Sequence, residues 1–174
     1  MCMVAGLDES FDRAIFIGYH SEGGSEKNPL AHTLSLLADV KINGEYASEF
    51  LINTYAAALH GVPVAFVSGD QALTEHIARY NDEIVTFATK EGIGHATISV
   101  SPQTTLKETK RLIEEAMKIE RSKLQIELPK QFNVEIIYKD HIKAYRNSFY
   151  PGAKFKAHNT VQFETTDYFE VLRL

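Results

Sequence analysis

The sequence predicts a single α/β domain over residues 1–174, with a largely parallel or mixed sheet and flanking helices. Short runs of branched and aromatic residues, typical of buried strands, alternate with stretches whose apolar residues recur at helical spacing. The chain has 174 residues, of which 44% are hydrophobic and 24% charged, enough for one substantial core. Because no internal repeat and no linker interrupts this alternation, we expect one domain.

The first third of the chain predicts two strands and a helix. The apolar run AIFI at 14–17 reads as a buried strand that ends just before His20. A polar loop rich in turn-forming residues continues to His32, and a second strand is expected at 38–42, ahead of an Asn-Gly turn. A helix is predicted over 45–60, because its apolar positions recur at helical spacing and a glycine and a proline follow it.

The rest of the chain continues the alternation. The segment VPVAFVSGD reads as a strand that enters a helix at Asp70, a good N-cap residue. A strand at 83–90 is followed by a glycine-bearing loop or strand edge, and Ser101 and Pro102 begin a long amphipathic helix that extends to about residue 123. The remaining predicted elements are a strand at 132–138, a short helix at 140–149, a Pro-Gly turn, a strand at 160–164 and a final helical turn or two.

Composition argues against several classes of protein. The single cysteine, Cys2, excludes an internal disulfide framework and a cysteine-based zinc site, and its terminal position does not favour a nucleophile. No signal-peptide pattern and no apolar run of roughly 20 residues is present, so we expect a cytoplasmic protein without membrane contact. The net charge is −5, and the basic residues of the second half alternate with glutamates as on solvated helix faces, so nucleic-acid binding is not expected.

Histidine and carboxylate chemistry is what the motifs leave open, since a phosphate-binding loop and a serine nucleophile elbow are both absent. Among seven histidines, His20 and His32 share one polar loop at the carboxyl end of the first strand, where ligands bind in open α/β sheets. Glu49 is expected on the exposed face of the first helix, one turn from Asn53, as a ligand beside an orienting amide. The alternative for these residues is an ordinary polar strand exit and a solvated helix face.

Five segments, in order and covering nearly the whole chain, carry a family resemblance. They are MVAGLDESFDRAIFIGYHSEGG, LAHTLS, INGEYASEFLINTYAAALHGVPVAFVSGD, KEGIGHATISVSP and PGAKFKAHNTVQFETTD. In these segments the chain resembles the zinc-dependent D-aminopeptidases associated with bacterial dipeptide-permease operons. The resemblance implies a hydrolase whose binuclear zinc site removes D-amino acids from the amino ends of short peptides, and subunits that assemble into rings.

Carried over residue by residue, the resemblance implies that His20 binds one zinc, that Glu49 binds the other, and that His32 is the catalytic histidine. Imidazole and carboxylate are good zinc ligands, and a nearby histidine can carry a proton. The chain departs from the family pattern because it contains no Asp-x-Glu pair, and because His95 stands where an arginine is expected. It therefore resembles the carboxyl-terminal two thirds of such an enzyme.

Two retained ligands, one per metal, are too few for a binuclear site, because catalytic zinc usually takes about three protein ligands. We therefore expect weak or absent zinc binding in the isolated chain. One hypothesis is a metallo-aminopeptidase homologue that acts on short peptides containing D-amino acids once a separate amino-terminal polypeptide completes its site. The alternative is a non-catalytic peptide-binding or assembly module, and both hypotheses predict a homo-oligomer. A natural split, a truncated reading frame and a descendant that has lost catalysis all remain open.

Overall fold

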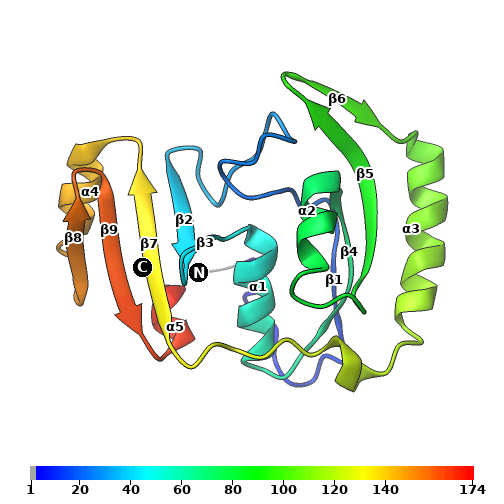
Figure 1. Ribbon diagram of the computed structural model, residues 1–174. Helices are drawn as coiled ribbons and strands as arrows, with labels where there is room; N and C mark the ends of the chain where they lie inside the picture. Colours follow the sequence, from blue (N-terminus) through cyan, green and yellow to red (C-terminus); the bar gives the residue numbers. More distant parts are fainter. Residues whose placement is uncertain (1–2) are drawn as a thin grey trace.

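The computed structural model describes residues 3–174, so the expectations about Cys2 lie outside the described residues, and it contains two sheets (Figure 1). The first sheet has the strand order β1-β4-β5-β6; β1, β4 and β5 run parallel, and β6 returns antiparallel to β5. Its strands are β1 (Ala14–Phe16), β4 (Val64–Asp70), β5 (Val85–Ile93) and β6 (Ala96–Ser99). The predicted α/β class and mixed sheet are thereby confirmed.

The second sheet is antiparallel throughout, with the strand order β3-β2-β7-β9-β8. Its strands are β2 (Ala38–Ile42), β3 (Glu45–Tyr46), β7 (Phe132–Tyr138), β8 (Ala153–Ala157) and β9 (Thr160–Thr165). The short strand β3 was not predicted. Asn43 and Gly44 have φ angles of 53° and 90°, the left-handed pair that closes a tight hairpin between β2 and β3. Residues 45–46 therefore belong to this hairpin, not to the predicted helix.

Five α-helices connect and cover the strands. They are α1 (Glu49–Ala58), α2 (Gln71–Ile77), α3 (Pro102–Ala116), α4 (His141–Asn147) and α5 (Tyr168–Val171), with a short 3-10 helix at Arg121–Leu124. The predicted caps are confirmed, because the side chains of Asp70 and Ser101 accept hydrogen bonds from the backbone N–H groups of Leu73 and Thr104. None of the helices in residues 3–174 combines the length and the apolar character needed to cross a membrane.

The first helix, α1, was predicted to lie at the surface, and this prediction is wrong. Every residue from Glu49 to Ala57 is buried, because α1 lies between the two sheets (Figure 1). Phe50 contacts Phe16 of β1 at 6.3 Å between ring centroids, and Tyr55 contacts Phe132 of β7 at 6.1 Å. One hydrophobic core thus reaches from the first sheet through α1 to the second, and it buries Glu49 as well.

Candidate metal centre

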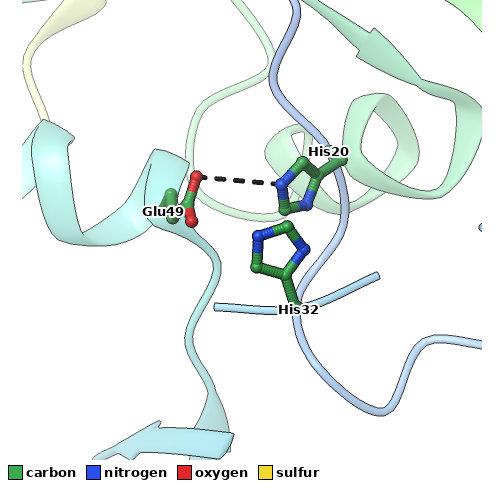
Figure 2. Close-up of side chains that lie close together, drawn as sticks. All are labelled: His20, His32 and Glu49. Carbon is green, nitrogen blue, oxygen red and sulfur yellow. Dashed lines mark ion pairs between the residues drawn. The ribbon is translucent and has the colours of Figure 1, made fainter. Parts of the chain in front are cut away.

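Three side chains that are far apart in the sequence converge at one point: His20, His32 and Glu49 (Figure 2). Each offers one ligand atom, and these atoms all lie within 4.8 Å of one another. Among residues 3–174, these are the histidine, cysteine or acidic side chains that form a group of at least three with ligand atoms close enough together to hold a metal ion. His20 and Glu49, which the family resemblance assigns to the two zinc ions, thus lie side by side in the structure.

His20 follows β1, where the chain runs along the end of β4. The backbone N–H of Gly18 donates to Ser68 Oγ at 3.1 Å, and that of Tyr19 donates to the Ser68 carbonyl at 3.0 Å. The Nδ1 atom of the His20 ring lies 3.0 Å from the Ser21 carbonyl. A carbonyl can only accept, so Nδ1 carries the proton and Nε2 keeps its lone pair.

His32 presents its ring in the same manner from the end of the loop. Its Nδ1 atom lies 2.7 Å from the carbonyl of Leu30, so its Nε2 atom is also left as the acceptor. The rings of His20 and His32 are 4.3 Å apart between centroids and tilted by 31°. The next residue, Thr33, donates to the Ala47 carbonyl at 2.8 Å and so fastens the loop to the chain just before α1.

Glu49 is the first residue of α1, and the fold dictates where its carboxylate points. One oxygen, Oε1, accepts the backbone N–H of Leu34 at 2.9 Å. The other, Oε2, lies 3.9 Å from Nε2 of His20, as the dashed line in Figure 2 marks. The Glu49 side chain is only 9% exposed, and a buried carboxylate is stable only with a donor or cation beside it. This carboxylate therefore has one oxygen held by the backbone and one oxygen directed at the histidines.

This donor set fits zinc. Zinc binds imidazole nitrogen and carboxylate oxygen at about 2.0 to 2.2 Å, and the two metals of a binuclear site are about 3.5 to 4 Å apart. The 3.9 Å separation of His20 Nε2 and Glu49 Oε2 therefore allows each atom to bind a different ion of such a pair. Both imidazoles also have Nδ1 bonded to a backbone carbonyl, the outer contact that metal-binding histidines usually make.

Other ionisable side chains lie outside this group. Glu22 is paired with His76, whose Nδ1 atom is 3.4 Å from the carboxylate and whose side chain is 15% exposed. Burial raises the pKa of Glu22, but the bonds from His76 and from the backbone outweigh it and leave that pKa below its usual value. Burial, together with nearby Glu45, raises the pKa of the Tyr80 phenol. His95 is exposed in the turn between β5 and β6.

The sequence analysis identified Asp70 only as a helix cap and did not connect it with the site. In the structure Asp70 is 1% exposed and accepts hydrogen bonds from Ser21 and Asn28, which belong to the loop that carries both histidines. The sequence feature that points to a structural role for Asp70 is a charged residue at the end of a strand whose other residues are apolar or small. Such a charge is buried only when it has partners.

Comparisons with known proteins identify the family of this chain. A family model described as D-aminopeptidase matches residues 1–174. The D-aminopeptidase of Bacillus subtilis (strain 168) is 27% identical over 175 residues, which cover 97% of this chain and 62% of that protein. The solved structure of the Zn-dependent D-aminopeptidase DppA from Bacillus subtilis, described as a self-compartmentalizing protease, is similar with a TM-score of 0.88 and 26% identity. That similarity covers 98% of this chain and 63% of the DppA chain, so the chain spans slightly less than two thirds of the relatives' length.

Proposed function

Because the chain belongs to the D-aminopeptidase family, we propose that it contributes one side of a zinc-dependent active site that removes amino-terminal D-residues from short peptides. The observation that carries the proposal is the convergence of His20, His32 and Glu49 from two separate segments. The chain's similarity to a D-aminopeptidase and to a zinc-dependent D-aminopeptidase supports the reaction and the metal.

Each residue has a distinct role in the proposed site. His20 would hold one zinc ion through Nε2, and Glu49 would hold the second through Oε2, since its other oxygen accepts the backbone N–H of Leu34. Zinc bound there would polarise the scissile carbonyl and lower the pKa of a bound water. His32 lies against the His20 ring with its own Nε2 lone pair available, so it can carry a proton to or from the reacting groups.

A binuclear site needs more ligands than this cluster offers. Catalytic zinc usually has about three protein ligands per ion, and the cluster offers three side chains in all. We propose that a further polypeptide segment supplies the remaining ligands. The relatives are longer than this chain, which is consistent with such a segment.

Zinc titration tests this proposal. Alone, the chain should bind zinc with a free energy below the roughly 10 kcal/mol that structural zinc sites reach, because too few ligands surround each ion. It should also hydrolyse D-alanyl peptides little. His20→Ala and Glu49→Gln should remove the residual zinc signal in calorimetry, whereas His158→Ala, in the exposed turn between β8 and β9, should leave it unchanged. Two tightly bound zinc ions and peptide cleavage by the chain alone would contradict the shared site, and no zinc uptake at all would favour a non-catalytic module.

We also propose that the chain forms a homo-oligomer in the cytoplasm. The description of the DppA relative as self-compartmentalizing supports assembly. Several large apolar side chains are also exposed at the surface, among them Leu106 at 75% and Phe149 at 72%. Sedimentation of the purified chain should therefore show a species larger than 19.5 kDa. A strictly monomeric, folded protein at high concentration would contradict this.

A further inference from the structure

A single buried carboxylate, that of Asp70, lies behind the loop that carries both histidines. Asp70 is the last residue of β4 and is 1% exposed. None of the ion pairs found in residues 3–174 includes it, so hydrogen bonds alone stabilise its charge. Four donors provide them, and charge-assisted bonds of this kind are the strong class of hydrogen bond.

The two oxygens of this carboxylate bond to different parts of the fold. Oδ1 accepts the backbone N–H of Leu73 at 2.8 Å and so caps α2. Oδ2 accepts the remaining three donors: the Ser21 backbone N–H at 2.8 Å, the Ser21 hydroxyl at 3.1 Å and the Asn28 amide at 2.6 Å. All three belong to the loop between β1 and β2 that carries both histidines. One carboxylate oxygen therefore bonds to the helix and the other bonds to this loop.

From Oδ2, one path leads to the ring of His20. The Ser21 residue that donates its N–H to Asp70 also accepts, through its carbonyl, the Nδ1 proton of His20 at 3.0 Å. Ser21 is fully buried, with 0% exposure, so its backbone has little freedom to reorient. The orientation of the Ser21 backbone, and through it the His20 ring, depends on Asp70.

A second path leads from the same oxygen to the ring of His32. The Asn28 amide donates to Asp70, and its carbonyl oxygen accepts the backbone N–H of Leu30 at 2.9 Å. The carbonyl of Leu30 then accepts the Nδ1 proton of His32 at 2.7 Å. Close packing holds this branch as well, because a methyl group on Gly92 of β5 would lie 2.2 Å from the Lys27 carbonyl and 2.8 Å from Asn28 Cα.

We propose that Asp70 is a positioning residue that sets the tautomer and orientation of both His20 and His32 from one carboxylate oxygen. By holding both acceptor carbonyls in place, it keeps the protons on the two Nδ1 atoms and leaves both Nε2 lone pairs directed at the cluster with Glu49. The use of those lone pairs for zinc and proton transfer rests on the proposed function, whereas the orientation itself does not. The hydrogen bonds around a histidine ring decide which of its two nitrogens carries the proton, so the two acceptor carbonyls impose the Nδ1 tautomer.

The ring tautomers can be measured directly by long-range ¹H–¹⁵N NMR at about pH 8, where unperturbed imidazole is neutral. Signals are assigned with His20→Gln and His32→Gln. The wild-type chain should show protonated Nδ1 in both rings. Asp70→Asn should shift both rings toward protonated Nε2, because an amide cannot satisfy the helix N–H and the three loop donors together. Asn28→Ala should shift only His32, because it removes one of the two paths.

Ser101→Ala is the matched control, since it removes the side-chain cap of α3 and touches neither path. It should leave both tautomers unchanged. As a second readout, zinc affinity should fall roughly 10- to 100-fold in Asp70→Asn, the usual cost of losing an outer contact of a metal-binding histidine.

Unchanged tautomers in a folded Asp70→Asn chain would overturn the proposal. If that variant does not fold, Asn28→Ala decides: a shift confined to His32 supports the positioning role, and no shift, or equal shifts in both rings, overturns it. A wild-type chain with the expected tautomers but no zinc binding would contradict the proposed function and leave the positioning role intact.

Discussion

Replacing Tyr168 with alanine should cost about 3 to 5 kcal/mol of the free energy of unfolding, as truncation of a large buried aromatic side chain usually does. Tyr168 opens α5 and is 1% exposed. Its ring packs on Tyr55 of α1 at 5.5 Å and on Phe132 of β7 at 4.9 Å, and its hydroxyl donates to the Ile52 carbonyl at 2.8 Å. One side chain therefore connects α5, α1 and the second sheet, and its loss leaves a cavity where they meet.

Urea denaturation of three variants separates the contribution of the Tyr168 ring to stability from that of its hydroxyl group. Tyr168→Phe keeps the ring and removes one hydrogen bond, so it should cost about 0.5 to 1.5 kcal/mol. Phe169→Ala changes the next residue of the same helix, which is 51% exposed, and should stay within about 0.5 kcal/mol of the wild type. If Tyr168→Ala were no more destabilising than Tyr168→Phe, the ring would not belong to the core that connects the two sheets.

The parts of the fold that the sequence predicted are those with a local cause. The run at 64–70 became β4, which is buried along its whole length, as expected for a strand covered on both faces. The run at 14–17 also became a strand, over Ala14–Phe16, but Ile15 is 40% exposed, so this strand is buried on one face only. The caps Asp70 and Ser101 were predictable because an N-cap bonds only two or three residues ahead. Each of these correct predictions depends only on residues that are close together in the sequence.

The errors in the prediction arise from distant packing. Glu49 and Asn53 fall on the more polar side of α1, yet both are buried, because residues from the start of the chain and from the loop after β1 cover that side. Leu34 and His20 lie against Glu49, and the backbone of Met3 and the hydroxyl of Tyr19 bond to Asn53. The antiparallel second sheet was missed as a separate layer for the same reason, since β2 pairs with β7 across a long interval. No pattern within one helix shows what will cover it.

The candidate site divides in the same way. His20 and His32 were candidates because they share a polar loop at a strand end, and Glu49 because of its place on the first helix, whereas their separate roles came from the family resemblance. The hydrogen-bond paths from Asp70 were not predictable, because they pass through backbone carbonyls of Ser21 and Leu30 whose directions only the folded loop defines. A buried aspartate at a strand end shows that partners exist and does not identify them.

The second large effect is expected for His32→Ala in a completed site. Such a site can be assembled by co-expressing this chain with the portion of the Bacillus subtilis D-aminopeptidase that the chain does not match. Zinc content and hydrolysis of D-alanyl peptides should both rise above those of the chain alone. His32→Ala should then reduce turnover by about 10² to 10⁴, the usual contribution of a positioned proton carrier.

The zinc measurement on the same variants decides which role His32 has, because its position permits two. The direct carboxylate contact, at 3.9 Å, is made by His20 Nε2, whereas His32 lies against the face of the His20 ring. Removing a proton carrier in that position removes no zinc ligand. Zinc affinity in His32→Ala should therefore fall by less than roughly tenfold, the smallest loss that usually follows removal of an outer contact of a metal ligand. His20→Ala and Glu49→Gln should lose zinc and turnover together. If His32→Ala also loses its zinc, His32 is a ligand, and the proton must be carried by another group.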